Sequence, residues 1–412
     1  MPIDEFFKKM VERDSSDLYL TTGRPPMYRI EGKIVPIGDV CFTDADLAAL
    51  AKEIMTERQQ KEFDQTREMN LAMAVPALAR FRVNIFQQRS AVGMVIRRIK
   101  ASPMTIADLE LPPVISDISM SKRGLALLVG STGSGKSTTL AAMIDHRNTH
   151  EAGHIITIED PIEFVHEHKQ SIITQREVGC DTQSFQAALK NTLRQAPDVI
   201  LIGEIRDTET MEAAIAFAET GHLCLATLHS NNANQAIERI MNFFPPERHA
   251  QIYLQLSLNL RAIISQRLVR AADGRRVAAM EILMDTPRVK DLIKKGAIDT
   301  LKEAMEQGVS EGCQTFDQAL FGLVKSGKID VEQALANADS SNNLRLKIKM
   351  AGLLNSDDTA DAARQGSPRK SKLRTKAACF GFRGCKRTAK AKPLPASRKP
   401  FLEIDAWKSM TF

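Results

Sequence analysis

A glycine-rich run between an apolar segment and a helix constrains the fold of this chain most. Residues 130–137 read GSTGSGKS and fit the pattern G-x-x-x-x-G-K-[ST] at every fixed position. Residues 125–129 before the run predict a buried parallel strand, and residues 138–144 after it predict a helix. The N–H groups of such a loop and the N-terminus of the following helix favour a bound phosphate. The sequence therefore predicts a nucleoside triphosphate site.

The polar residues of this loop have expected partners on the nucleotide. The ammonium group of Lys136 is expected to reach the β- and γ-phosphates, and the hydroxyl of Ser137 is expected to hold Mg²⁺. ATP and Mg²⁺ are therefore the expected cofactors. The predicted nucleotide contacts are Gly130, Ser131, Thr132, Gly133, Ser134, Gly135, Lys136, Ser137 and Thr138.

Length and composition indicate a soluble globular protein with two or three domains. The chain has 412 residues, 43% of them hydrophobic, and contains no run of about 18 apolar residues that could cross a bilayer. Its first residues lack the apolar stretch of a secretory signal, so the expected location is the cytoplasm. The six cysteines are scattered without a C-x-x-C pair, which indicates reduced thiols rather than disulfides or a zinc site.

The positive charge is concentrated at the C-terminal end. From Arg364 onward there are 14 Lys and Arg residues and two acidic residues, a net charge of +12. Residues 1–363 carry 42 basic and 48 acidic groups, a net charge of −6. A mildly acidic body argues against a nucleic-acid-binding enzyme, so no nucleic acid is expected as a partner. The tail itself is suited to an anionic surface.

The chain divides into four predicted regions. Residues 1–100 are expected to form a small α+β domain, and the proline-containing residues 101–113 a linker. Residues 114–350 alternate strands and helices, as in a parallel sheet covered on both faces. Residues 351–412 are basic and lose apolar periodicity, so a disordered tail is expected there. The strands predicted in the first region cover residues 17–21, 26–30, 33–37, 80–87 and 92–99.

An acidic cluster follows residues 154–158, which read HIITI and predict a strand. Glu159, Asp160 and Glu163 come directly after this predicted strand. Because Pro161 cannot continue a central strand, the cluster is expected just past the strand's carboxyl end, where open α/β sheets bind ligands. A solvated acidic loop is the alternative interpretation.

A second carboxylate follows the apolar residues 199–202. This buried strand leads to Gly203 and then Glu204. A carboxylate at that place can hold the hydration shell of Mg²⁺, as the acidic residue of a Walker-B strand does. A simple charge at a strand end is the alternative.

Histidines bracket a third predicted strand, residues 223–228. His229 is expected to hydrogen-bond a γ-phosphate or the acidic loop and so to report the nucleotide state. Each histidine by itself is more often structural than catalytic. The spacing of His222 and His229 does not suit a metal pair on one helix face.

Two arginines stand on adjacent predicted strands of the first region, Arg82 within residues 80–87 and Arg97 within residues 92–99. Surface arginines on strands are usually solvated. In a ring of subunits, however, the small domain of one subunit could present them to the nucleotide of a neighbour, since phosphoryl transfer gains from positive charge at the transition state.

Four segments in this order resemble the secretion-type hexameric ATPases, and within them the PilT/PilU retraction motors of type IV pili. They are the glycine-rich loop, the acidic box at residues 157–164, the Walker-B-like residues 203–207 and the histidine box at residues 220–231. The resemblance covers about residues 1–350 and implies a PAS-like N-terminal domain followed by a RecA-like motor domain. Residues 84–89 and 342–349 resemble the accessory PilU type more than PilT.

The resemblance also implies roles and partners. Glu163 resembles the glutamate that polarises the attacking water, Glu204 the Walker-B glutamate that organises Mg²⁺, and Arg82 and Arg97 fall where the family offers arginines at subunit interfaces. The implied protein is a homo-hexameric ATPase that retracts pili in twitching motility. It would act with a PilT-type motor and an inner-membrane pilus platform protein, at the cytoplasmic side of the inner membrane.

Three other functions stay open from the sequence. A pilus-assembly or type II secretion ATPase would use the same site, although the extra N-terminal domain and four-cysteine insert of those relatives have no counterpart here. A non-catalytic ATP-binding adaptor of a sister motor is the second. A RecA-like nucleic-acid motor is the third, and residues 114–350 lack the basic, aromatic-rich groove that it would need.

Overall fold

The computed structural model describes residues 3–75, 78–99 and 103–353, which contain two separate β-sheets. Most of the predicted tail and part of the predicted linker therefore lie outside the described residues. Each sheet is described by itself. No helix within these ranges is long and apolar enough to span a bilayer.

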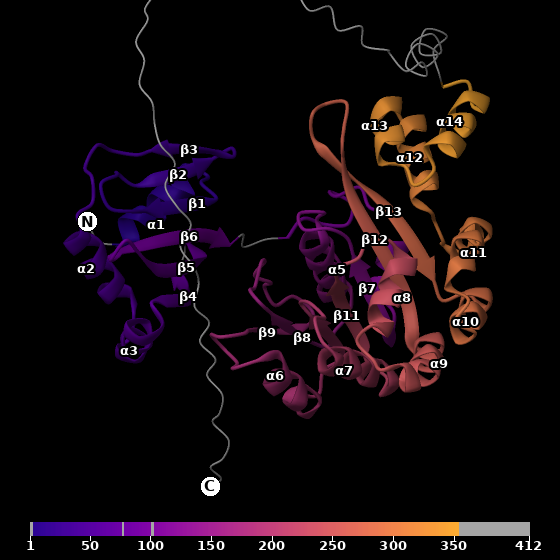
Figure 1. Cartoon of the computed structure of the whole chain (residues 1–412), viewed down its shortest axis with the longest axis horizontal. Helices are drawn as coiled ribbons and strands as arrows, with labels where there is room; N and C mark the ends of the chain where they lie inside the picture. The colour runs from indigo at the N-terminus through magenta and orange to yellow at the C-terminus, as the bar shows by residue number, and fades with distance from the viewer. Residues whose placement is uncertain (1–2, 76–77, 100–102, 354–412) are drawn as a thin grey trace, which may run out of the picture. The chain divides into compact units, whose positions relative to one another are not determined.

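The first sheet is antiparallel, with six strands in the order β3-β2-β1-β6-β5-β4 (Figure 1). β5 buries alternate residues, Phe81, Val83 and Ile85, because successive side chains of a strand point to opposite faces. α1 packs on this core, and the ring of Phe7 stacks on that of Phe81 with the centroids 4.2 Å apart. The elements are α1 (Ile3–Glu12), β1 (Asp17–Leu20), β2 (Met27–Ile30), β3 (Lys33–Pro36), α2 (Asp44–Ile54), α3 (Glu57–Thr66), β4 (Glu68–Val75), β5 (Ala79–Gln88) and β6 (Ala91–Ile99).

β4 is a strand that the sequence pattern does not predict. Its residues read EMNLAMAV, and alanine is depleted in strands. In the structure Met69 and Leu71 are buried in the core of the small domain, and β4 pairs with β5 along its whole length. Pairing and burial therefore hold β4 as a strand despite its weak local propensity.

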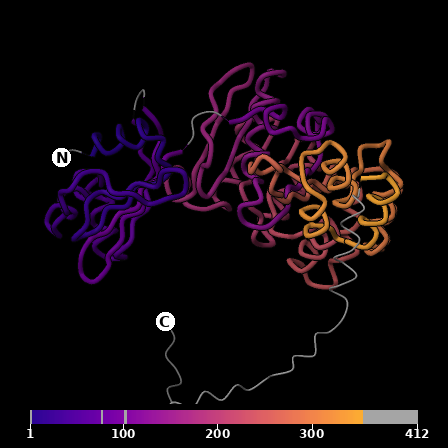
Figure 2. The backbone as a smooth tube through the Cα atoms, turned by 90° about the horizontal axis from the view of Figure 1, so that it is seen from above, coloured from indigo at the N-terminus to yellow at the C-terminus, as the bar shows by residue number. Residues whose placement is uncertain are grey.

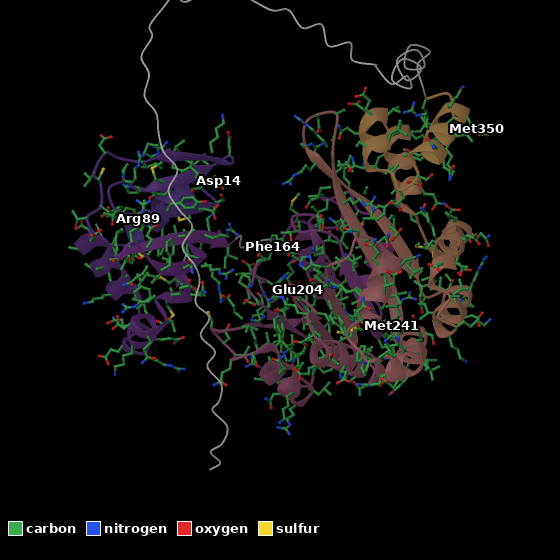
Figure 3. All side chains as sticks on the ribbon, in the orientation of Figure 1. Asp14, Arg89, Phe164, Glu204, Met241 and Met350 are labelled. Atoms are coloured by element: carbon green, nitrogen blue, oxygen red, sulfur yellow. The ribbon has the colours of Figure 1, made fainter. Side chains whose placement is uncertain are left out.

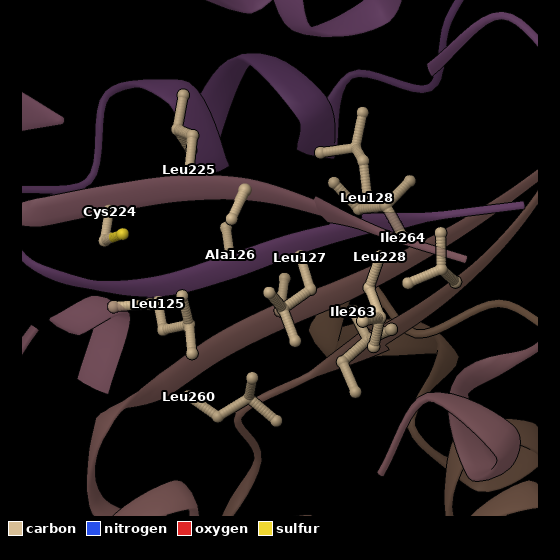
Figure 4. Packing of buried hydrophobic residues seen from close by; sticks show 14 of the residues in the cluster. Leu125, Ala126, Leu127, Leu128, Cys224, Leu225, Leu228, Leu260, Ile263 and Ile264 are labelled. Carbon is tan, nitrogen blue, oxygen red and sulfur yellow. The ribbon is translucent and has the colours of Figure 1, made fainter. Parts of the chain in front are cut away.

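The second sheet has seven strands in the order β13-β12-β7-β11-β10-β8-β9. Neighbouring strands run parallel, except that β13 pairs antiparallel with β12 at one edge. Every residue of β7, β10 and β11 is buried, and Figure 4 shows apolar side chains of β7 projecting from both faces of the sheet. The strands are β7 (Gly124–Val129), β8 (His154–Glu159), β9 (Ile172–Glu177), β10 (Val199–Ile202), β11 (Leu223–Leu228), β12 (Leu260–Arg270) and β13 (Arg276–Met284).

Helices connect most of the parallel strands and cover the faces of the sheet, whereas β8 leads to its parallel neighbour β9 without a helix. α5 follows β7, α7 follows β10 and α8 follows β11. The helices of this domain are α4 (Val114–Ser119), α5 (Lys136–His150), α6 (Phe185–Thr192), α7 (Thr208–Glu219), α8 (Ala233–Met241), α9 (His249–Asn259), α10 (Pro287–Lys294), α11 (Leu301–Gln307), α12 (Phe316–Lys325), α13 (Val331–Asn337) and α14 (Ser341–Met350).

The last three helices form a cluster with a core of its own. Phe316, Leu320 and Leu344 are fully buried in it, and Figure 2 shows α12 to α14 lying together in the orange to yellow part of the trace. Arg267 of β12 joins this cluster to the sheet. Its guanidinium carbon lies 3.8 Å from the centroid of the Phe316 ring, and it pairs with Asp339 at 2.8 Å.

Candidate nucleotide site

The carboxyl ends of four neighbouring parallel strands lie on the same side of the second sheet, at the ends of the strands. They are neighbours in the order β7-β11-β10-β8. The glycine-rich loop follows β7, the acidic box follows β8, Glu204 follows β10 and His229 follows β11. One cleft is lined by Lys136, Ser137, Glu163, Glu204 and His229, and Glu204 is labelled in Figure 3. Segments that were predicted separately thus meet where open α/β sheets bind ligands.

The loop itself needs glycine at several positions. Gly130, Gly133 and Gly135 have φ values of 151°, 79° and 90°, which other residues rarely adopt. A Cβ atom on Gly130 would lie 2.6 Å from the carbonyl oxygen of Gln266, and one on Gly135 would lie 2.7 Å from Nε2 of Gln266. Thr132, Gly133, Gly135, Lys136, Ser137 and Thr138 line the cleft, and Gly130, Ser131 and Ser134 line an adjoining pocket.

Lys136 is folded back on the loop. Its Nζ donates hydrogen bonds to the carbonyl oxygens of Gly130 at 2.8 Å and Ser131 at 3.0 Å. The side chain is buried, and burial lowers its pKa below the ordinary value for lysine. These two carbonyl contacts hold the ammonium group within the loop that is expected to surround the phosphates.

The acidic box contains one half-buried glutamate, Glu159, and one exposed glutamate, Glu163. Glu159 accepts a hydrogen bond from the hydroxyl of Thr157 at 2.6 Å and another from Nε2 of Gln175 at 3.3 Å. Its burial raises the pKa of the Glu159 carboxyl. Glu163, by contrast, is exposed in the cleft. The two glutamates therefore suit different tasks, Glu159 within the hydrogen-bonded frame of the box and Glu163 toward a ligand or water.

The carboxylate of Glu204 is held by two cationic or polar partners. Its Oε1 lies 3.1 Å from Nε2 of His229, and its Oε2 lies 2.7 Å from Nη2 of Arg206. The guanidinium of Arg206 also lies 3.5 Å from Asp160. His229 thus meets Glu204 directly, whereas the connection from Glu204 to the acidic box runs through Arg206, which the sequence analysis does not single out.

The structure places the two predicted arginines opposite each other in the first sheet. Arg82 of β5 and Arg97 of β6 are directly paired in the antiparallel register. Nε of Arg97 donates to Oδ1 of Asp17 at 2.7 Å, and 61% of the Arg97 side chain is exposed. Within their own domain these arginines therefore lie on the surface of the sheet.

His222, the other histidine of its box, belongs to a turn. Its Nδ1 lies 3.0 Å from the hydroxyl of Thr220 and 3.3 Å from the carbonyl oxygen of Phe217. These contacts close the end of α7 before β11 begins. His222 therefore has a structural role, as is common for a single histidine.

Three further residues border the nucleotide loops without a sequence prediction. The side chain of Gln175 accepts from the backbone N–H of His166 at 2.8 Å and donates to the carbonyl oxygen of Phe164 at 2.9 Å. His166 lines the cleft, and its buried Nδ1 has no hydrogen-bond partner among the residues that the structure describes. Arg276 lines both the cleft and the adjoining pocket. His166 lies two residues beyond the acidic box, so a histidine close to that box was the available signal.

Comparison with known proteins assigns the family. Residues 3–352 match the family described as "Type II/IV secretion system protein". The chain belongs to this family. It is 51% identical over 358 residues to the type IV pilus ATPase PilU of Pseudomonas aeruginosa, an alignment that covers 87% of this chain and 94% of that protein. It is 43% identical to the type IV pilus retraction ATPase PilT of the same organism, over 83% of this chain and 100% of that protein.

Solved structures agree with this assignment. The crystal structure of the pilus retraction motor PilT with bound ADP superposes with a TM-score of 0.77 and 40% identity, over 82% of this chain and 98% of that one. The Legionella pneumophila ATPase DotB superposes with a TM-score of 0.67 and 26% identity, over 82% of this chain and 95% of that one. The predicted fold class and the predicted resemblance to the PilT/PilU branch are confirmed. The protein is a nucleotide-binding ATPase.

Proposed function

We propose that this ATPase is a hexameric motor of type IV pilus retraction, of the accessory PilU type. It would act with a PilT-type motor on the platform protein of the pilus, at the cytoplasmic face of the inner membrane. The observation that carries the proposal is the 51% identity to PilU over 94% of that protein's length. The identity to PilT is lower, at 43%.

The glycine-rich loop would bind the phosphates of ATP. Its N–H groups and the N-terminus of α5 supply donors, because Gly135 precedes the helix without a side-chain cap. The ammonium group of Lys136 would leave the carbonyl oxygens of Gly130 and Ser131 and meet the β- and γ-phosphates, which are stronger acceptors. Binding therefore exchanges two contacts within the loop for charge-assisted ones.

The donors in the cleft fit Mg²⁺. This ion prefers oxygen ligands and usually keeps several waters, and the hydroxyl of Ser137 and the carboxylate of Glu204 both line the cleft. We assign these two residues to the metal, Glu204 through the hydration shell. When bound, Mg²⁺ neutralises charge that develops on the phosphates.

The remaining chemistry is orientation and charge. Glu163, exposed in the cleft, would orient the attacking water, and His229 would hold the carboxylate of Glu204 in place and sense the γ-phosphate. Arg82 and Arg97 would come from the small domain of a neighbouring subunit and meet the charge of the transition state. Phosphoryl transfer depends largely on such positioning and electrostatics.

Pilus assembly is the nearest alternative, and the comparisons weigh against it. The assembly ATPase PilB of Acinetobacter baylyi is 32% identical over 65% of this chain, and the match spans only 47% of PilB. A relative that differs over half its length is a poorer guide to function than one that matches throughout.

Phosphate release measured with and without a PilT-type motor tests this proposal. We expect the mixture to hydrolyse ATP several-fold faster than the sum of the two separate proteins, because the accessory motor would work with its partner. Strictly additive rates would contradict the accessory role. If the mixture keeps its rate when Glu204→Gln replaces the wild-type chain, the chain acts as an adaptor and not as a motor.

A further inference from the structure

Two neighbouring polar residues follow the apolar residues 262–264 in β12. Ser265 and Gln266 are 0% and 3% exposed. Successive residues of a strand point to opposite faces, so these two side chains reach different elements. β12 pairs with β7, whose end leads into the phosphate-binding loop, and Ser265 lies opposite Val129 in that pairing. The two polar groups are thus buried directly beside the nucleotide site.

Gln266 contacts the first turn of α5 and the loop before it. Its Oε1 accepts a hydrogen bond from the hydroxyl of Thr139 at 2.8 Å, and Thr139 is 1% exposed. Its backbone oxygen and Nε2 are the atoms that a Cβ on Gly130 or Gly135 would strike. Gln266 therefore packs against both ends of the glycine-rich loop.

The side chain of Ser265 points to the opposite face of the sheet and contacts the buried side chain of Glu281 on β13. The hydroxyl of Ser265 donates to Oε1 of Glu281 at 3.0 Å, and the same oxygen accepts the backbone N–H of Ala233 at 2.8 Å. Glu281 is 2% exposed, so its hydrogen bonds take the place of water. Ala233 is the first residue of α8, and the loop before it carries His229.

We infer that Gln266 and Glu281 are positioning residues of the ATPase site, joined through Ser265. Gln266 holds the phosphate-binding turn, and Glu281 holds the start of α8 and with it the loop of His229. The β12–β13 hairpin thereby sets the distance between the loop that binds phosphates and the histidine that contacts Glu204. The Glu281 half rests on the proposed role of His229, whereas the Gln266 half rests on phosphate binding alone.

The two halves predict different kinetic defects. Gln266→Leu and Thr139→Val each remove the hydrogen bond beneath the loop, so each should weaken the binding of a non-hydrolysable ATP analogue on the order of tenfold. Glu281→Leu leaves the N–H of Ala233 unpaired and should lower turnover at saturating ATP on the order of tenfold, with analogue affinity within about twofold. Glu281→Gln retains an acceptor oxygen and should restore most of the turnover.

A double-mutant cycle in the full chain decides between positioning and mere stability. Gln266→Leu combined with Thr139→Val should bind the analogue no more weakly than the poorer single variant, since both remove the same bond. Ser257→Ala and Thr192→Val are matched controls that delete hydrogen bonds within α9 and α6, to the carbonyl oxygens of Leu254 and Ala188. Both controls should lower the melting temperature without changing analogue affinity.

The Gln266 assignment would be overturned if the losses of analogue affinity in the two single variants add up in the double variant. It would also be overturned if the control variants lose as much analogue affinity as Gln266→Leu. Normal turnover of Glu281→Leu would overturn the Glu281 assignment. His229→Ala, measured in parallel, tests the proposed role of the histidine separately. If Gln266→Leu does not fold, Thr139→Val alone tests the role of Gln266, because it removes only the hydroxyl that donates to Gln266.

Discussion

The two sheets of this protein present their polar groups in different ways. β5 and β6 of the first sheet have one buried face, and Arg82 and Arg97 lie on the other face, which is at least partly exposed. The central strands of the second sheet are buried on both faces, so their chemistry is confined to the loops at their carboxyl ends. A sheet with one exposed face can present side chains of its strands to another molecule. A sheet that is buried on both faces binds ligands at the carboxyl ends of its strands.

This comparison divides the proposed reaction between two regions. Phosphate and metal binding belong to the loops of the second sheet, and the charge on the transition state belongs to the strand arginines of the first. Changes in the second sheet should therefore alter binding, chemistry or stability within a single chain. Changes at Arg82 and Arg97 of the first sheet should act on the reaction in a neighbouring chain.

The largest effect is expected at Glu204. Glu204→Gln should keep analogue affinity and lower kcat by a factor on the order of 10² or more, since a carboxylate that organises metal and water acts mainly on the transition state. Phosphate release at saturating ATP and analogue titration together measure this split. Glu163→Gln should behave alike. Near-normal turnover of Glu204→Gln would remove this carboxylate from the mechanism.

The second expectation compares the loss of stability caused by a substitution in the second sheet with that caused by one in the first sheet. Leu127→Ala in β7 removes a fully buried side chain and should lower the free energy of unfolding by about 2–5 kcal/mol. Ile34→Ala in β3 removes a side chain that is 48% exposed and should cost about 0.5 kcal/mol or less. Denaturant unfolding of both variants checks the difference. Equal losses in the free energy of unfolding would mean that Ile34 is buried against another part of the protein.

A smaller effect is expected at His166 when the pH falls. Burial lowers the pKa of His166 to about 4, while an unfolded histidine titrates near 6.5. Between these values the unfolded chain binds a proton that the folded chain does not, so acid favours unfolding. Wild type should therefore lose about 2 kcal/mol more than His166→Leu between pH 7 and pH 5. Denaturation curves at the two pH values measure this, and identical losses would show that the folded histidine is readily protonated.

The local parts of the site could be predicted from the sequence. The glycine-rich loop follows β7 directly, and Glu163 and Glu204 come within a few residues of the ends of β8 and β10. Short segments therefore indicate both the residue and its place near a strand end. The family resemblance depends on the same contiguous segments. These are the features for which neighbours in sequence are also neighbours in space.

The connecting parts could not be predicted in this way. Thr139 and Gln266 are 127 positions apart, and only the pairing of β12 with β7 brings them together. The signal for Gln266 and Glu281 is a polar residue inside an apolar strand, which has no meaning until its partner is known. The arginines are a different case, because the proposed partner of Arg82 and Arg97 lies on a neighbouring chain.

The most direct test of this account mixes two inactive variants. A Lys136→Ala chain keeps Arg82 and Arg97, and an Arg82→Ala/Arg97→Ala chain keeps its phosphate-binding loop. In a mixed ring some interfaces would pair an intact loop with intact arginines. After co-assembly is confirmed, phosphate release measured across mixing ratios should rise above that of either variant alone, as arginines acting in trans require. Co-assembled mixtures that stay as inactive as the separate variants would show that each chain completes its own site.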